Sequence, residues 1–171
     1  MGLSVELFRV LFPQLLEGLQ PAEAEALVQS FSRLEMRAGE AVIAEHTVND
    51  AAYLLWEGEV ACVKSLHGHD LFIGAFGPGR IFGESHAVEP GEQSVTMQAV
   101  THGTLLRLRH ADLERLGETQ PRIAGTVLRV LSLEMAKWLR TFEEYMSGRT
   151  QLNNIGECIA MVRQLHQLKE K

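Results

Sequence analysis

Hydrophobic and polar positions along the chain follow three successive patterns. From Leu3 to about Ser32, apolar residues recur every three to five positions, the spacing of one face of a helix, and Pro21 suits the first turn of one. From Arg33 to about Arg109, short runs rich in β-branched and aromatic side chains follow a period of two. From Pro121 onward the helical period returns. We therefore expect one or two short N-terminal helices, a β region and a long helix.

The β region contains seven runs that predict strands, at residues 34–36, 41–44, 52–56, 60–64, 71–76, 94–100 and 104–108. Glycine and proline turns separate these runs every 10 to 20 residues, as at Gly77-Pro78-Gly79. Such punctuation is typical of an antiparallel sandwich or barrel and not of alternating strands and helices. The pattern predicts a mainly β fold with flanking helices, a double-stranded β-helix (jelly-roll) barrel of about eight strands.

The long helix is predicted over residues 121–145 from one apolar stripe with spacings of four, four, three, four and three: Val127, Leu131, Met135, Trp138, Phe142 and Tyr145. Because one jelly roll is too small to cover this stripe, we expect much of it to pack against the same helix of a second chain, giving a homodimer. The alternative, a helix lying wholly on its own barrel, stays open. A shorter helix is expected after Ser147-Gly148. Residues 1–120 then form the jelly-roll domain with its N-terminal helices, and residues 121–171 the dimer helix and C-terminal helix.

Composition narrows the class of protein. The chain has 171 residues, 46% of them hydrophobic and 22% charged, as in ordinary globular domains. No apolar stretch approaches the roughly 18 residues of a membrane span, and the first residues lack a signal-peptide pattern, so we expect a cytoplasmic protein without membrane contact. Cys62 and Cys158 lie far apart without a CxxC companion, which indicates neither a disulfide framework nor a zinc knuckle.

The charge balance disfavours general binding to nucleic acid. The 16 basic residues are outnumbered by 22 acidic ones, the net charge is −6, and no basic run is longer than two. Proteins that grip many phosphates of a duplex need clustered lysine and arginine.

The run Phe82-Gly83-Glu84-Ser85 is the strongest candidate for a ligand site. Gly83 lets the backbone approach a ligand, and the residues after it predict one short helical turn whose free N–H groups face an anion. Glu84 is a good acceptor for a sugar hydroxyl. About ten residues later, Gln93 and Ser94 offer further donors from the start of the next strand.

Several spaced motifs carry a resemblance to a known family. They are, in order, Arg37-Ala38-Gly39-Glu40, the segment from Tyr53 to Val60, Gly77-Pro78-Gly79, Ile81-Phe82-Gly83-Glu84, then Ala99 and the long helix. Together they resemble the cyclic nucleotide-binding domain. Over roughly residues 8–165 the chain is similar in particular to the sensor half of the catabolite activator family of bacterial transcription regulators.

The resemblance implies roles for individual residues. In the family, backbone amides, a hydroxyl and an arginine hold the cyclic phosphate, and the glutamate of the FGE motif holds the ribose 2′-hydroxyl. Gly83, Glu84 and Ser85 match this pattern and Ser94 matches the hydroxyl, but Gln93 stands at the arginine position and Val95 at a usual alanine. A neutral amide does not replace a guanidinium, whose charge-assisted hydrogen bonds contribute roughly 1.5–3 kcal/mol each. We expect affinity for cyclic AMP to fall by at least about two orders of magnitude.

Other departures point to an altered site. The usual Glu-Gly pair before the third strand reads Glu45-His46, and the adenine-contacting hydroxyl residues of the activator are replaced near residues 141–143. His86 could supply part of the missing positive charge if protonated, and it could equally be a loop histidine without a ligand. The resemblance thus implies a regulatory module, not an enzyme, that binds cyclic AMP, cyclic GMP or another nucleotide weakly and uses no other cofactor. A degenerate dimeric interaction module that binds no nucleotide stays open.

The end of the sequence bears on DNA binding. Residues 152–157 resemble the start of the helix that precedes the winged helix-turn-helix of the activator family, and no recognition helix follows them here. We therefore expect no DNA binding by this chain and a protein partner instead.

A cupin-type metal enzyme is the main competitor, because His67-Gly68-His69 resembles the HxH of that metal site. Cupins place a glutamate three or four residues later, whereas Leu71, Phe72 and Ile73 follow Asp70 here. We expect this segment to be an exposed hairpin tip, with no metal bound. A haem site through a histidine or Cys62 stays open as well, although no spacing selects a ligand.

Overall fold

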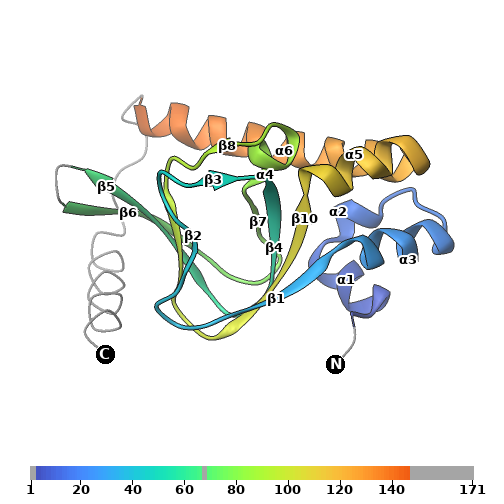
Figure 1. Cartoon of the computed structure of the whole chain (residues 1–171), viewed down its shortest axis with the longest axis horizontal. Helices are drawn as coiled ribbons and strands as arrows, with labels where there is room; N and C mark the ends of the chain where they lie inside the picture. The colour runs from blue at the N-terminus through green and yellow to red at the C-terminus, as the bar shows by residue number, and fades with distance from the viewer. Residues whose placement is uncertain (1–2, 67–68, 147–171) are drawn as a thin grey trace.

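The computed structural model describes residues 3–66 and 69–146. Antiparallel strands occupy the middle of the molecule, short helices from the N-terminal segment cover one end, and one long helix runs along the side (Figure 1). This arrangement confirms the predicted mainly β fold with flanking helices.

Three short helices precede the strands: α1 (Val5–Leu11), α2 (Pro13–Leu16) and α3 (Pro21–Ser30). Pro21 occupies the first turn of α3, as predicted, since a missing N–H is no loss there. The Glu23 carboxylate accepts a hydrogen bond from the backbone N–H of Gln20 at 2.8 Å and closes a capping box. These helices bury Phe8, Phe12 and other apolar residues against the strands.

The strands form three antiparallel sheets and not one closed barrel. One sheet has the order β1-β10-β4-β7, a second the order β2-β9-β5-β6, and β3 pairs with β8. Their bounds are β1 Ser32–Met36, β2 Ala41–Ile43, β3 Val48–Asn49, β4 Ala51–Glu57, β5 Val60–Leu66, β6 His69–Phe76, β7 Ile81–Phe82, β8 Gly91–Glu92, β9 Thr96–Ala99 and β10 Gly103–Arg109. Every one of the seven predicted runs contains a strand.

Strand β4 separates the two main cores because both of its faces are buried. Leu54 packs into the core beneath the helices, whereas Leu55 packs into the core between the two larger sheets. The core between the sheets also holds Phe82 and Met97, which brings β7 and β9 close to each other. These two strands frame the pocket described below.

The long helix α6 (Pro121–Met146) follows α5 (His110–Thr119), which the sequence pattern did not predict. Val127 and Leu131, two residues of the predicted stripe, are buried in the core of their own chain, while the expected pairing of this helix with a second copy stays a prediction. Helix α6 packs against α5, α4 and α2 (Figure 1). Leucines on other faces of α6 are exposed: Leu128, Leu133 and Leu139. The predicted C-terminal helix lies outside the described residues.

Candidate functional site

The site begins at a sharp turn between β7 and the short helix α4 (Glu84–Val88). Gly83 joins them with φ of 73°, in the left-handed region that favours glycine. A Cβ at this position would lie 2.7 Å from the carbonyl oxygen of Ala51, so backbone packs where a side chain would begin. The turn presents Glu84 and Ser85 to the space between the sheets, and the predicted helical turn after Gly83 is confirmed.

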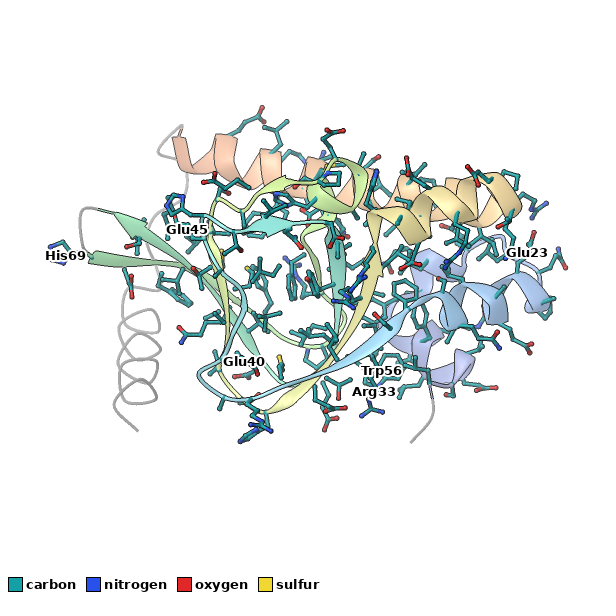
Figure 2. All side chains as sticks on the ribbon, in the orientation of Figure 1. Glu23, Arg33, Glu40, Glu45, Trp56 and His69 are labelled. Carbon is teal, nitrogen blue, oxygen red and sulfur yellow. The ribbon has the colours of Figure 1, made fainter. Side chains whose placement is uncertain are left out.

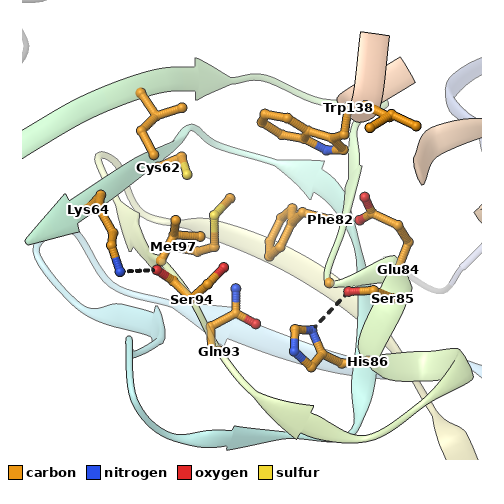
Figure 3. A pocket seen from close by; sticks show the side chains of 14 residues that line it. Cys62, Lys64, Phe82, Glu84, Ser85, His86, Gln93, Ser94, Met97 and Trp138 are labelled. Atoms are coloured by element: carbon orange, nitrogen blue, oxygen red, sulfur yellow. Dashed lines mark hydrogen bonds between the residues drawn. The ribbon is translucent and has the colours of Figure 1, made fainter. Parts of the chain in front are cut away.

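A pocket of about 600 Å³ opens beside this turn. All five residues predicted for the ligand site line it, although they come from two separate segments (Figure 3). The full lining is Cys62, Lys64, Ile73, Phe82, Gly83, Glu84, Ser85, His86, Gln93, Ser94, Val95, Met97, Trp138 and Leu139. Small-molecule sites in proteins commonly span about 300–1,000 Å³.

Glu84 places a buried carboxylate in the wall of the pocket, with 7% of the residue exposed. Burial raises the pKa of this carboxyl, whereas a hydrogen bond from its own backbone N–H lowers it. The nearby Glu134 carboxylate raises the pKa as well, and Arg80 lowers it. Within the described residues, no other side chain donates a hydrogen bond to Glu84. Its oxygens are therefore acceptors that a ligand can use.

Gln93 is also buried, with 6% of the residue exposed. Its backbone is held on both sides, since its N–H donates to Thr47 at 2.8 Å and its carbonyl accepts from the His46 N–H at 2.9 Å. Its side-chain Oε1 has no hydrogen-bond partner within the described part of the chain. The position at which the resemblance implied an arginine is thus a neutral amide whose buried oxygen has no partner in that part of the chain.

His86 lines the pocket but is already engaged in hydrogen bonds. Its Nε2 lies 3.2 Å from the carbonyl oxygen of Glu92, which only accepts, so Nε2 carries a hydrogen. Its Nδ1 lies 3.3 Å from the hydroxyl oxygen of Ser85, which donates to it when the ring is neutral. Both ring nitrogens of His86 are thus engaged within the protein.

Lys64 is a cation in the pocket that the sequence reasoning missed. Its ammonium group donates to the carboxylate of Glu45 and to the carbonyl oxygen of Ser94, the latter at 2.9 Å. The Lys64 hydrogen bond, together with one from the Ser65 N–H, holds the pKa of Glu45 below its usual value. The positive charge of Lys64 is thus balanced inside the protein. The sequence did offer a signal for Lys64, because it lies two residues after Cys62 on one predicted strand, and residues two apart on a strand share a face.

The remaining lining is largely apolar and includes two residues of α6, Trp138 and Leu139. The Trp138 ring meets Phe76 edge to face at a centroid distance of 5.6 Å. These residues precede positions 141–143, where the resemblance implied adenine contacts, and Glu143 is exposed. The side chains of Thr141 and Phe142 lie outside the described set. Burial raises the pKa of the Cys62 thiol to about 12, so this wall of the pocket is chemically inert.

The cupin alternative finds no support in the described residues. His69 begins β6 and points outward at the far end of the β5–β6 hairpin (Figure 2), while His67 lies outside the described range. Across residues 3–66 and 69–146, no three or more His, Cys, Asp or Glu side chains gather in a way that could hold a metal ion. None of the helices in that part of the chain combines the length and apolar character that crossing a membrane requires.

Comparison with known proteins agrees with this geometry. The family model described as the cyclic nucleotide-binding domain matches residues 33–120, just over half of the chain. The chain belongs to this family. The cyclic AMP receptor protein of Thermus thermophilus is 29% identical over 119 residues, which cover 69% of this chain and 55% of that protein. The chain thus spans about half the length of that curated relative.

Two solved structures show the same architecture. A cyclic nucleotide-binding domain from Methylobacillus flagellatus superposes with a TM-score of 0.74 at 20% identity, covering 91% of this chain and 90% of that one. The N-terminal domain of a transcriptional regulator from Streptomyces coelicolor gives a TM-score of 0.63 at 26% identity, covering 83% of this chain and 95% of that one. The described structure is therefore a cyclic nucleotide-binding fold related to bacterial regulators.

Proposed function

We propose that this chain is a cytoplasmic regulatory module without enzymatic activity, whose cyclic nucleotide pocket has a weakened phosphate site. Gly83, Glu84, Ser85, Gln93 and Ser94 form the proposed ligand-binding set. One observation carries the proposal: the buried position where the family resemblance expects a phosphate-binding arginine holds the neutral Gln93.

The charges of the pocket support this reading. A cyclic phosphate that enters a buried site loses water and needs a compensating cation. Lys64 already donates to Glu45 and to the Ser94 carbonyl, and Glu84 adds a carboxylate to the wall. An arginine at position 93 would supply two parallel charge-assisted hydrogen bonds, and we expect its absence to weaken cyclic AMP binding by about a hundredfold.

Helix α6 is the proposed output of the module. Trp138 and Leu139 line the pocket, while Leu128 and Leu133 on the same helix are exposed. We propose that two chains pair through this helix, and that a ligand touching Trp138 favours one arrangement of the pair over another. Such a shift requires that the ligand bind the two arrangements with different affinities.

The two segments of the chain divide these tasks in the proposal. Residues 1–120 hold the ligand, and residues 121–171 pass the signal to a protein partner. Direct DNA binding by this chain is not part of the proposal, because its net charge is −6 and no basic run is longer than two.

Isothermal titration with cyclic AMP, cyclic GMP and cyclic di-GMP tests the altered phosphate site. We expect Gln93→Arg to bind cyclic AMP about a hundredfold more tightly than the unchanged protein. Gln29→Arg is the matched control, since Gln29 is exposed on α3 and adds the same charge away from the pocket. Micromolar binding of cyclic AMP by the unchanged protein would overturn the proposal.

A dimeric interaction module that binds no nucleotide is the second candidate, favoured by the exposed leucines of α6. Sedimentation of a Leu128→Glu, Leu133→Glu double variant tests the pairing, and we expect a monomer in place of a dimer. If the unchanged protein dimerises and Gln93→Arg still binds none of the three nucleotides, this second candidate replaces the first.

A further inference from the structure

Within the described part of the chain, one pocket holds a buried amide oxygen without a partner and a buried carboxylate that no other residue's side chain reaches by a hydrogen bond. Oε1 of Gln93 is buried and accepts no hydrogen bond. The Glu84 carboxylate is 7% exposed at the residue level and receives no hydrogen bond from another side chain there. Figure 3 shows Glu84 and Gln93 on different segments around the same hollow. Buried polar atoms are normally paired, so the Gln93 oxygen points to a ligand that donates a hydrogen bond, and the Glu84 carboxylate beside it has room to accept another.

The charges of the same pocket disfavour an anion as the preferred ligand. Its lysine donates to Glu45, its histidine lies within hydrogen-bond distance of Ser85 and Glu92, and Glu84 adds a carboxylate to the wall. A phosphate would lose its hydration and meet a carboxylate and an amide oxygen. A hydroxyl or amino group loses less on burial and gains an acceptor at each of these oxygens.

The rest of the wall suits a flat apolar body. Phe82, Met97 and Trp138 line the pocket together with Ile73 and Val95. Aromatic and thioether side chains pack favourably against planar rings. A carboxylate, with two oxygens in one plane, also accepts two neighbouring hydroxyl donors at once. The pocket thus combines a ring-binding wall with acceptors for hydroxyl groups.

We propose that the pocket takes a phosphate-free ligand of the nucleoside type, whose hydroxyl groups donate to the Glu84 carboxylate and the Gln93 amide oxygen while its ring lies beside Trp138. This inference rests on the proposed function, because it names the ligand class of the same site. The proposed function states only that the neutral residue at position 93 weakens the binding of ligands that carry a phosphate. This inference adds that the same residue favours ligands without one.

The test compares adenosine with cyclic AMP and guanosine with cyclic GMP by isothermal titration, with Trp138 fluorescence as a second readout. We expect at least one nucleoside to bind the unchanged protein ten times or more tightly than its own cyclic phosphate. Gln93→Arg reverses that preference. Gln93→Met, which keeps the length of the side chain but removes the acceptor, weakens the nucleoside about tenfold, whereas Gln29→Met on the exposed face of α3 does not.

Glu84→Gln probes the second acceptor and weakens the nucleoside by a similar factor. Glu25→Gln, exposed on α3, is its control, and a cooperative thermal transition shows that both variants fold. The inference is overturned if neither nucleoside binds the unchanged protein up to about 1 mM, or if each cyclic phosphate binds at least as tightly as its nucleoside.

The outcomes separate this inference from the proposed function. If no nucleoside binds but Gln93→Arg gains cyclic AMP binding, the weakened phosphate site stands and the nucleoside preference falls. If the unchanged protein binds cyclic AMP at micromolar concentration, the weakened phosphate site falls, and the nucleoside preference falls with it when each cyclic phosphate also binds at least as tightly as its nucleoside.

Discussion

The turn at Gly83 allows a quantitative test, because a second glycine has nearly the same positive φ without its crowding. Gly83 has φ of +73° and a Cβ there would meet the Ala51 carbonyl oxygen at 2.7 Å. Gly18 has φ of +74°, and a Cβ there would meet nothing within 4 Å. Substituting alanine at either position therefore places an L side chain at positive φ, but only Gly83→Ala also forces backbone atoms apart.

The expected free energies follow from these contacts. A left-handed alanine costs about 1–2 kcal/mol, and the loss of glycine's freedom in the unfolded chain returns about 0.4–1 kcal/mol. Gly18→Ala should then lower the free energy of unfolding by about 1 kcal/mol. Overpacking adds about 1–3 kcal/mol, so Gly83→Ala should lower it by about 3 kcal/mol.

Urea unfolding followed by circular dichroism measures both values, provided the slope with urea is the same in all three proteins. A ligand-free comparison is sufficient, since the turn is part of the protein itself. Equal losses for Gly18→Ala and Gly83→Ala would refute the close approach of β4 to the turn, and with it the reason that the chain needs glycine beside Glu84.

Three further predictions concern titratable side chains. Because burial raises the pKa of Glu84, the protonated carboxyl contributes fully to stability below the ordinary carboxyl pKa, and this contribution is lost as pH rises through the raised pKa. Glu84→Gln should therefore be more stable than the unchanged protein only on the alkaline side. Urea unfolding at several pH values measures this difference. The pKa of Glu45 shifts in the opposite direction, because the hydrogen bond from Lys64 lowers it. Glu45→Gln should therefore be less stable than the unchanged protein near neutral pH. A loss of stability that persisted below the lowered pKa would contradict the ion pair. In a Cys158→Ser background, Cys62 should react with iodoacetamide at pH 8 only after unfolding, because its thiol is buried with a pKa of about 12; rapid labelling of the folded protein would disprove this burial.

The sequence predicted the longer strands because their apolar residues alternate and glycines mark their ends. It missed β3, β7 and β8, which have two residues each and exist through pairing with distant segments, as between Tyr53 and Phe82. A period of two cannot be detected in a run so short. Helix α5 was missed as well, although Leu113 and Leu116 are buried at helical spacing.

The candidate site was predictable where a local motif defines it and not where distant residues meet. Gly83 to Ser85 form the expected turn, and Gln93 and Ser94 reach the same pocket. The pairing of Lys64 with Glu45 joins residues 19 positions apart and depends on how the sheets fold. The stripe on the long helix was read correctly as apolar, but periodicity does not tell which neighbour covers it, and Val127 turned out to face its own chain.

The backbone at Gln93 has a consequence for how this family diversifies. Its N–H and carbonyl are held by hydrogen bonds to the backbones of Thr47 and His46. These bonds do not involve the side chain, so the side chain can be exchanged while the backbone keeps its position. Both glutamine codons become arginine codons through a change of one base. Under the proposed function, one mutational step would therefore exchange a neutral residue for a cationic one at the phosphate site, without rebuilding the loop that presents it.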